Sequence, residues 1–63
     1  MIDDARIREF CETEGFRFET WETKPWEARE DVNPYPPNTE PHRNWAIGAA
    51  KRREIERRIV AEV

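Results

Sequence analysis

All five prolines of this 63-residue chain fall between residues 25 and 41, and four of them lie in the stretch NPYPPNTEP, residues 33–41. Proline lacks the backbone N–H, fixes its own φ and disfavours helix at the preceding residue. We therefore expect a stiff, irregular or polyproline-like crossover here, with regular structure at the two ends of the chain. A ligand for a polyproline-binding groove is the alternative, which the position between two elements disfavours.

The N-terminal segment MIDDARIREFCETEG has the pattern of a helix over about residues 3–14. Asp3 or Asp4 can cap its free amides. Gly15 suits the left-handed position that ends a helix, and Phe16 would then contact the last turn. Three apolar residues share one face at i, i+3, i+4 spacing: Ile7, Phe10 and Cys11.

The next segment, FRFETWETKPWEARED, alternates apolar and polar residues at its start and favours an extended backbone. A lone strand has no ladder partner in this chain, so it would pair only with another copy or a binding partner. We expect instead an extended arm and proline-rich connection over residues 16–41, laid across the helices. One helical turn is compatible with residues 26–31, because Pro25 is tolerated in a first turn.

The C-terminal segment predicts the longest helix, over about residues 44–62, although two starts fit: Thr39 with Pro41 in the first turn, or Asn44 as the cap. Arg52 and Glu56 fall within its apolar face, so this face must meet something charged, either the acidic first helix or a partner protein. The apolar face itself gathers six residues at helical periodicity: Trp45, Gly48, Ala49, Ile55, Ile59 and Val63.

Core-forming residues are scarce, because leucine is absent and Ile, Val and Phe number eleven among 63 residues. That share lies below the roughly 20% at which disorder becomes an alternative. Three tryptophans offset the deficit, since each can bury about 150–250 Å². We expect a single small, mainly α domain of marginal stability, with two antiparallel helices and little or no sheet.

The charges are segregated along the chain, whose net charge is -3. Residues 1–40 carry eleven acids and five bases (-6), and residues 41–63 carry three acids and six bases (+3). This opposition suits either a chain folded back on itself or head-to-tail contact between copies. One cysteine cannot form an internal disulfide, and no apolar stretch is long enough for a signal peptide or membrane span, so a cytoplasmic protein without membrane contact is expected.

Catalysis is not expected from this inventory. The chain has no serine, one cysteine and one histidine, so only a Cys11–His42 pair could act as nucleophile and base, and nothing supplies an oxyanion hole. No CxxC, HxxxH or EF-hand spacing occurs, which argues against a metal. The only glycines are Gly15 and Gly48, so no phosphate-binding loop exists. We predict no enzyme activity and no cofactor.

Nucleic-acid binding is the alternative function, because an arginine-rich helix can grip phosphates. The helical geometry weakens it, since the basic residues divide between the two sides of the apolar face, and Glu54 can pair with Arg58. The net negative charge also disfavours it. The candidate contacts for this alternative are Lys51, Arg53, Arg57 and Arg58.

Protein binding has positive support, because Trp, Tyr and Arg are the residue types enriched at interface hot spots. Trp26 on the arm and Tyr35 on the connection are the expected anchors, and Trp21 is a further candidate, whereas Trp45 is expected in the core. A larger protein or assembly is the expected partner, with self-association as a further possibility. The predicted protein contacts are Trp26, Tyr35, Trp21, Arg53 and Arg57.

A short helix ending in EGF, then a W-E-x-x-P-W-E run, then a proline-rich Tyr-containing stretch before an Arg-rich helix resembles small uncharacterised proteins encoded by phages and prophages. The resemblance covers most of the chain and rests on no chemical motif. It implies a non-enzymatic accessory role in the host cytoplasm or the virion. That role would be either a minor virion or assembly component or an inhibitor of a host system, such as an anti-CRISPR protein.

Overall fold

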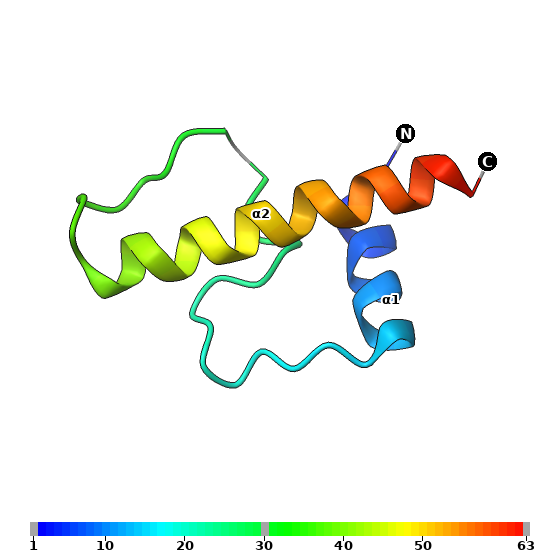
Figure 1. Cartoon of the computed structure of the whole chain (residues 1–63), viewed down its shortest axis with the longest axis horizontal. Coiled ribbons are helices and arrows are strands. Elements are labelled where there is room, and N and C mark those ends of the chain that lie inside the picture. Colours follow the sequence, from blue (N-terminus) through cyan, green and yellow to red (C-terminus); the bar gives the residue numbers. More distant parts are fainter. Residues whose placement is uncertain (1, 30, 63) are drawn as a thin grey trace.

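The computed structural model describes residues 2–29 and 31–62, and the regular structure in these ranges consists of two helices. Helix α1 spans Asp4–Glu14 and helix α2 spans Glu40–Ala61. The described residues between them form turns and irregular backbone without a strand. The predicted mainly α fold, with two helices and a long connection, is confirmed (Figure 1).

Both ends of α1 are capped as its sequence predicts. Asp3 accepts a hydrogen bond from the backbone N–H of Arg6 through Oδ1, at 2.9 Å. Gly15 adopts a left-handed conformation with φ of 71°. The N–H of Phe16 then donates to the carbonyl of Cys11 at 3.2 Å, which completes a Schellman turn.

Helix α2 begins earlier than residue 44. Thr39 is the N-cap, and its side chain accepts from the N–H of His42 at 3.3 Å. Pro41 fits the first turn because the N–H that it lacks would have no partner there in any case. Asn44 is therefore a buried residue inside the helix and not its cap. The earlier of the two predicted starts is the one that forms.

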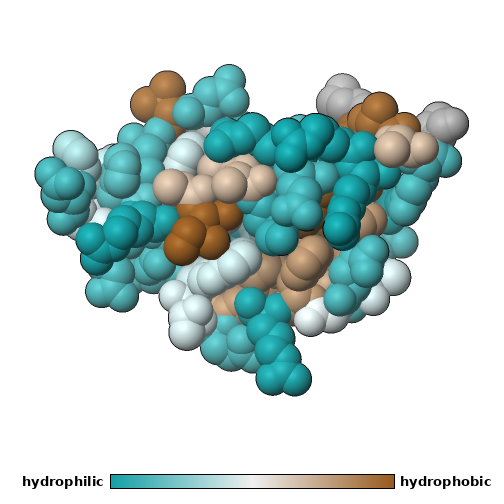
Figure 2. Space-filling view, in the orientation of Figure 1, coloured by the Kyte–Doolittle hydropathy of each residue, from teal (hydrophilic) through white to brown (hydrophobic). Residues whose placement is uncertain are grey.

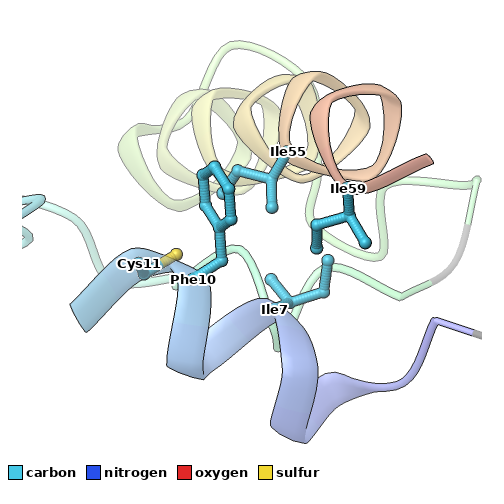
Figure 3. Packing of buried hydrophobic residues seen from close by; sticks show 5 residues of the cluster. All are labelled: Ile7, Phe10, Cys11, Ile55 and Ile59. Carbon is cyan, nitrogen blue, oxygen red and sulfur yellow. The ribbon is translucent and has the colours of Figure 1, made fainter. Parts of the chain in front are cut away.

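The two helices cross and do not run antiparallel (Figure 1). Helix α1 lies across the C-terminal half of α2, and one buried cluster joins them (Figure 3): Ile7, Phe10, Cys11, Ile55 and Ile59. The antiparallel arrangement predicted from the sequence is wrong, because α1 is short and the arm covers the rest of the α2 apolar face. That coverage removes the need for a second helix alongside α2.

The arm packs directly on the N-terminal half of α2. Its helical turn begins two residues earlier than the predicted 26–31: Glu27 and Ala28 donate backbone N–H groups to the carbonyl of Lys24 at 2.9 and 3.3 Å. Ala28 then joins a second buried cluster with Trp45 and Ala49. The arm backbone approaches Gly48 so closely that an added Cβ would lie 2.6 Å from the Thr23 carbonyl oxygen. The arm therefore contacts α2 at Trp45, Gly48 and Ala49.

The charged pair in the apolar face of α2 meets the first helix. The Arg52 side chain is only 11% exposed, and its guanidinium contacts Asp4 at 2.8 Å and Glu56 at 2.7 Å. The same group donates to the carbonyl of Pro25 at 3.4 Å. Of the two alternatives for this face, the acidic first helix is therefore the one observed. Arg52 ties α1, the arm and α2 together.

Cys11 is expected to be unreactive in the folded protein. Burial first, and then the charge of Glu12, raise the pKa of the Cys11 thiol above its ordinary value. Reaction with a disulfide reagent near pH 8 should be at least about 100-fold slower in buffer than in denaturant, because it requires opening of the fold. Equal rates in the two conditions would show that the thiol is not enclosed.

The raised pKa of the Cys11 thiol also determines how the free energy of unfolding changes with pH. Because the pKa in the folded state is raised, the neutral buried thiol contributes its full stabilisation below the ordinary thiol pKa. That contribution is lost as the pH rises through the folded-state pKa. Urea unfolding at alkaline pH, compared with Cys11→Ala, measures it: the wild type should lose more stability on that rise than the variant.

Candidate protein-binding groove

A shallow groove of about 450 Å³ lies beside the C-terminal half of α2. Arg53, Arg57 and Val60 are spaced i, i+4, i+7, so they project from one side of the helix. We refer to this site as the terminal groove, and its lining residues are Ile2, Arg53, Glu56, Arg57 and Val60. The structure thus brings together two of the predicted protein contacts.

Arg53 and Arg57 differ from the other cations in the second half of α2 because they form no ion pair with a described residue. Lys51 pairs with Glu54 at 3.1 Å, and Arg58 pairs with the same carboxylate at 3.7 Å. The hydrogen bond and charge of Lys51 lower the pKa of the Glu54 carboxyl. Neither Arg53 nor Arg57 has an ion pair with any other described residue. Among the described residues, the two guanidinium groups at the groove therefore have no carboxylate partner.

Apolar side chains complete the groove. Val60 is 63% exposed, and Ile2 is half-buried, partly packed against the main core cluster. In the view of Figure 2, apolar atoms gather in one region near the middle and in a smaller area at the upper right, with hydrophilic surface around them. The terminal groove combines cationic and apolar chemistry in one place, so it can bind a segment that carries both carboxylates and an apolar side chain.

The arm tryptophans lie in an aromatic cluster apart from the groove lining. Trp26 packs against the main core, with its ring edge-to-face against Phe18 at 5.4 Å and Arg8 over its ring at 5.4 Å. The ring centroids of Trp21 and Phe18 are 5.2 Å apart. Both tryptophans are half-buried, so a large part of their surface stabilises the fold. Their role as binding anchors stays a prediction.

Tyr35 is exposed on the proline-rich connection, next to the N-terminal end of α2. Its backbone is held on both sides: its N–H donates to Asn33 Oδ1 at 3.0 Å, and its carbonyl accepts from His42 Nδ1 at 3.1 Å. His42 is in the first turn of α2, whereas Arg53 lies three turns further along. The predicted contacts therefore fall on separate surfaces and do not form one site.

The residues of the nucleic-acid alternative do not form one basic face. Lys51 and Arg58 both turn toward Glu54, and the Lys51 ammonium also lies 4.9 Å from the Phe16 ring centre. This leaves Arg53 and Arg57 as the unpaired members of the predicted set within the described ranges. Two cations beside apolar side chains suit a protein partner better than a phosphate backbone.

The residues considered for catalysis do not meet. Cys11 is in the core between the helices, and His42 contacts the connection through Tyr35. Over residues 2–29 and 31–62, no three His, Cys, Asp or Glu residues gather as metal ligands would.

Within the same ranges neither helix has both the length and the apolar composition of a membrane span.

Sequence reasoning missed the apolar half of the terminal groove. Val60 follows Arg53 by seven residues, a spacing that could have placed both on one side of the helix. Ile2 had no such signal, because it precedes the first helical residue and its position depends on how α1 crosses α2.

Comparison of the chain with protein-family models, curated proteins and solved structures finds no match.

Proposed function

We propose that this chain is a non-enzymatic protein-binding module whose terminal groove docks onto an acidic, partly apolar segment of a larger protein. The observation that carries the proposal is the pair Arg53 and Arg57, which lack an ion pair among the described residues and stand beside the exposed Val60. An accessory or inhibitor role of the kind that the phage resemblance implies would use this surface to occupy a site on its target.

The chemistry of the groove defines the partner. A guanidinium offers a planar fork of donors that matches a carboxylate, and arginine is enriched at interface hot spots. Val60 and Ile2 can add apolar burial next to these charged contacts. Glu56 in the same lining disfavours a dense array of carboxylates, so one or two acids around an apolar side chain fit best.

We expect the double variant Arg53→Glu/Arg57→Glu to lose the partner. Tagged protein would be captured from nuclease-treated lysate of cells that express it, and bound proteins would be quantified by mass spectrometry. Recovery should fall about tenfold or more, because reversing two charges turns attraction into repulsion. The matched control is Arg17→Glu/Arg43→Glu, which makes the same charge change at exposed positions outside the groove and should retain the partner.

Two results would contradict the proposal. If the groove variant captured the same proteins as the wild type, the groove would not be the docking surface. If recovery disappeared with nuclease, and binding weakened steeply as salt rose from about 50 to 200 mM, the nucleic-acid alternative would replace it. An interface with an apolar centre should lose much less over that range.

A further inference from the structure

We propose that the chain binds itself head to tail, with the Asp31–Val32 tip of one copy in the terminal groove of the next. This inference rests on the proposed function in one respect, since it uses the same groove as a protein-binding surface. It adds that residues 31–32 of this chain are themselves a segment of the kind that the groove can bind. The second copy is the occupant that we infer for the groove in the purified protein.

The tip has the chemistry that the groove requires. Val32 is 75% exposed, the highest exposure among the large apolar residues of the described chain. Asp31 beside it is exposed, and no cation of the described residues forms an ion pair with it. An apolar side chain next to an unpaired carboxylate is therefore presented on the connection between the arm and α2.

The groove complements the tip in charge and in apolar surface. Arg53 and Arg57 can donate hydrogen bonds to the Asp31 carboxylate, while Val60 and Ile2 provide an apolar surface for Val32. The complementarity extends over the molecule, because residues 1–40 carry a net -6 and residues 41–63 a net +3. A head-to-tail contact brings the acidic part of one copy to the basic part of the next.

The contact is between copies and not within one chain. The lining of the groove does not include Asp31 or Val32, and the exposure of Val32 shows that its own groove does not cover it. Tip and groove are different surfaces, so the contact is heterologous and each dimer leaves one free tip and one free groove. Repetition of the contact gives rings or open chains of copies.

Sedimentation velocity on the purified protein tests the inference. Over a range of roughly 10 µM to 1 mM, which suits the small contact, the mean mass of the wild type should rise with concentration. Two variants should stay monomeric: the tip variant Asp31→Asn/Val32→Ser and the groove variant Arg53→Glu/Arg57→Glu. These four residues are exposed, so circular dichroism should show intact helices in both variants.

Mixing the two variants gives the decisive result. The tip variant keeps a functional groove and the groove variant keeps a functional tip, so their equimolar mixture should form a 1:1 heterodimer that cannot grow further. A wild type that stays monomeric throughout, or a mixture that forms no heterodimer while the wild type associates, would overturn the inference. The experiment needs no other protein, so self-association can fail while the partner capture of the proposed function persists.

Discussion

Replacing Gly48 with alanine is expected to lower the free energy of unfolding by about 1–3 kcal/mol, the usual cost of forcing an extra group into a packed core. The Cβ of the new residue would lie 2.6 Å from the Thr23 carbonyl oxygen, which belongs to the arm backbone and cannot rotate away as a side chain can. Urea unfolding followed by tryptophan fluorescence measures the loss, as a lower midpoint at unchanged slope.

The sign of this effect is what makes it diagnostic. Alanine is the better helix former by about 1 kcal/mol, so in an unobstructed helix the same change would stabilise the protein. Ala46→Gly and Ala50→Gly, at exposed positions on the same helix, provide the control and measure the propensity difference alone. Stabilisation by Gly48→Ala would show that the arm does not pack against α2 at this point.

The second large effect is expected from Arg52→Met. Breaking a buried ion pair by removing one partner costs about 3–5 kcal/mol. Here the Asp4 and Glu56 side chains are 34% and 40% exposed, so water compensates in part. We expect a loss of about 2 kcal/mol, a large share of the ~3–5 kcal/mol that a core of this size supplies. Thermal and urea unfolding measure it.

Arg58→Met is the matched control for Arg52. It removes the same group from the same helix, but the Arg58 side chain is 53% exposed and its contact with Glu54 is 3.7 Å long. Exposed pairs of this kind contribute about 0–1 kcal/mol. Equal losses for the two variants would mean that the link from Arg52 to α1 and the arm adds nothing to stability.

The elements of this fold could be predicted from the sequence because their signals are local. The Ile7, Phe10, Cys11 spacing and the Gly15 turn define α1 within a dozen residues. The sequence does not decide whether α2 starts at Thr39 or at Asn44, since both residues are good caps. Only the packing of Asn44 into the folded molecule separates the two possibilities.

The helix crossing and the full site depend on contacts that no local pattern encodes. Whether α1 runs along α2 or across it depends on how much of the α2 apolar face the arm covers. Gly48 leaves room for the arm backbone at one point of that face, but a glycine in the sequence does not predict the path of the arm. Arg53 and Arg57 are predictable as contacts because arginine is enriched at interface hot spots. Val60 is not joined to them by that signal, and the position of Ile2 depends on the helix crossing itself. Trp26, expected as an exposed anchor because it lies on the arm, is half-buried.

The contact between Arg52 and Asp4 joins residues 48 positions apart in the chain. Most small helical proteins fold fast because their contacts are close in sequence, and rates fall as the mean separation of contacting residues grows. In this chain the main core cluster and the Arg52–Asp4 ion pair connect the first helix with the last, so a large loop must close before these contacts form. Folding should therefore be slower than for a helix pair of the same size whose core contacts are all close in sequence.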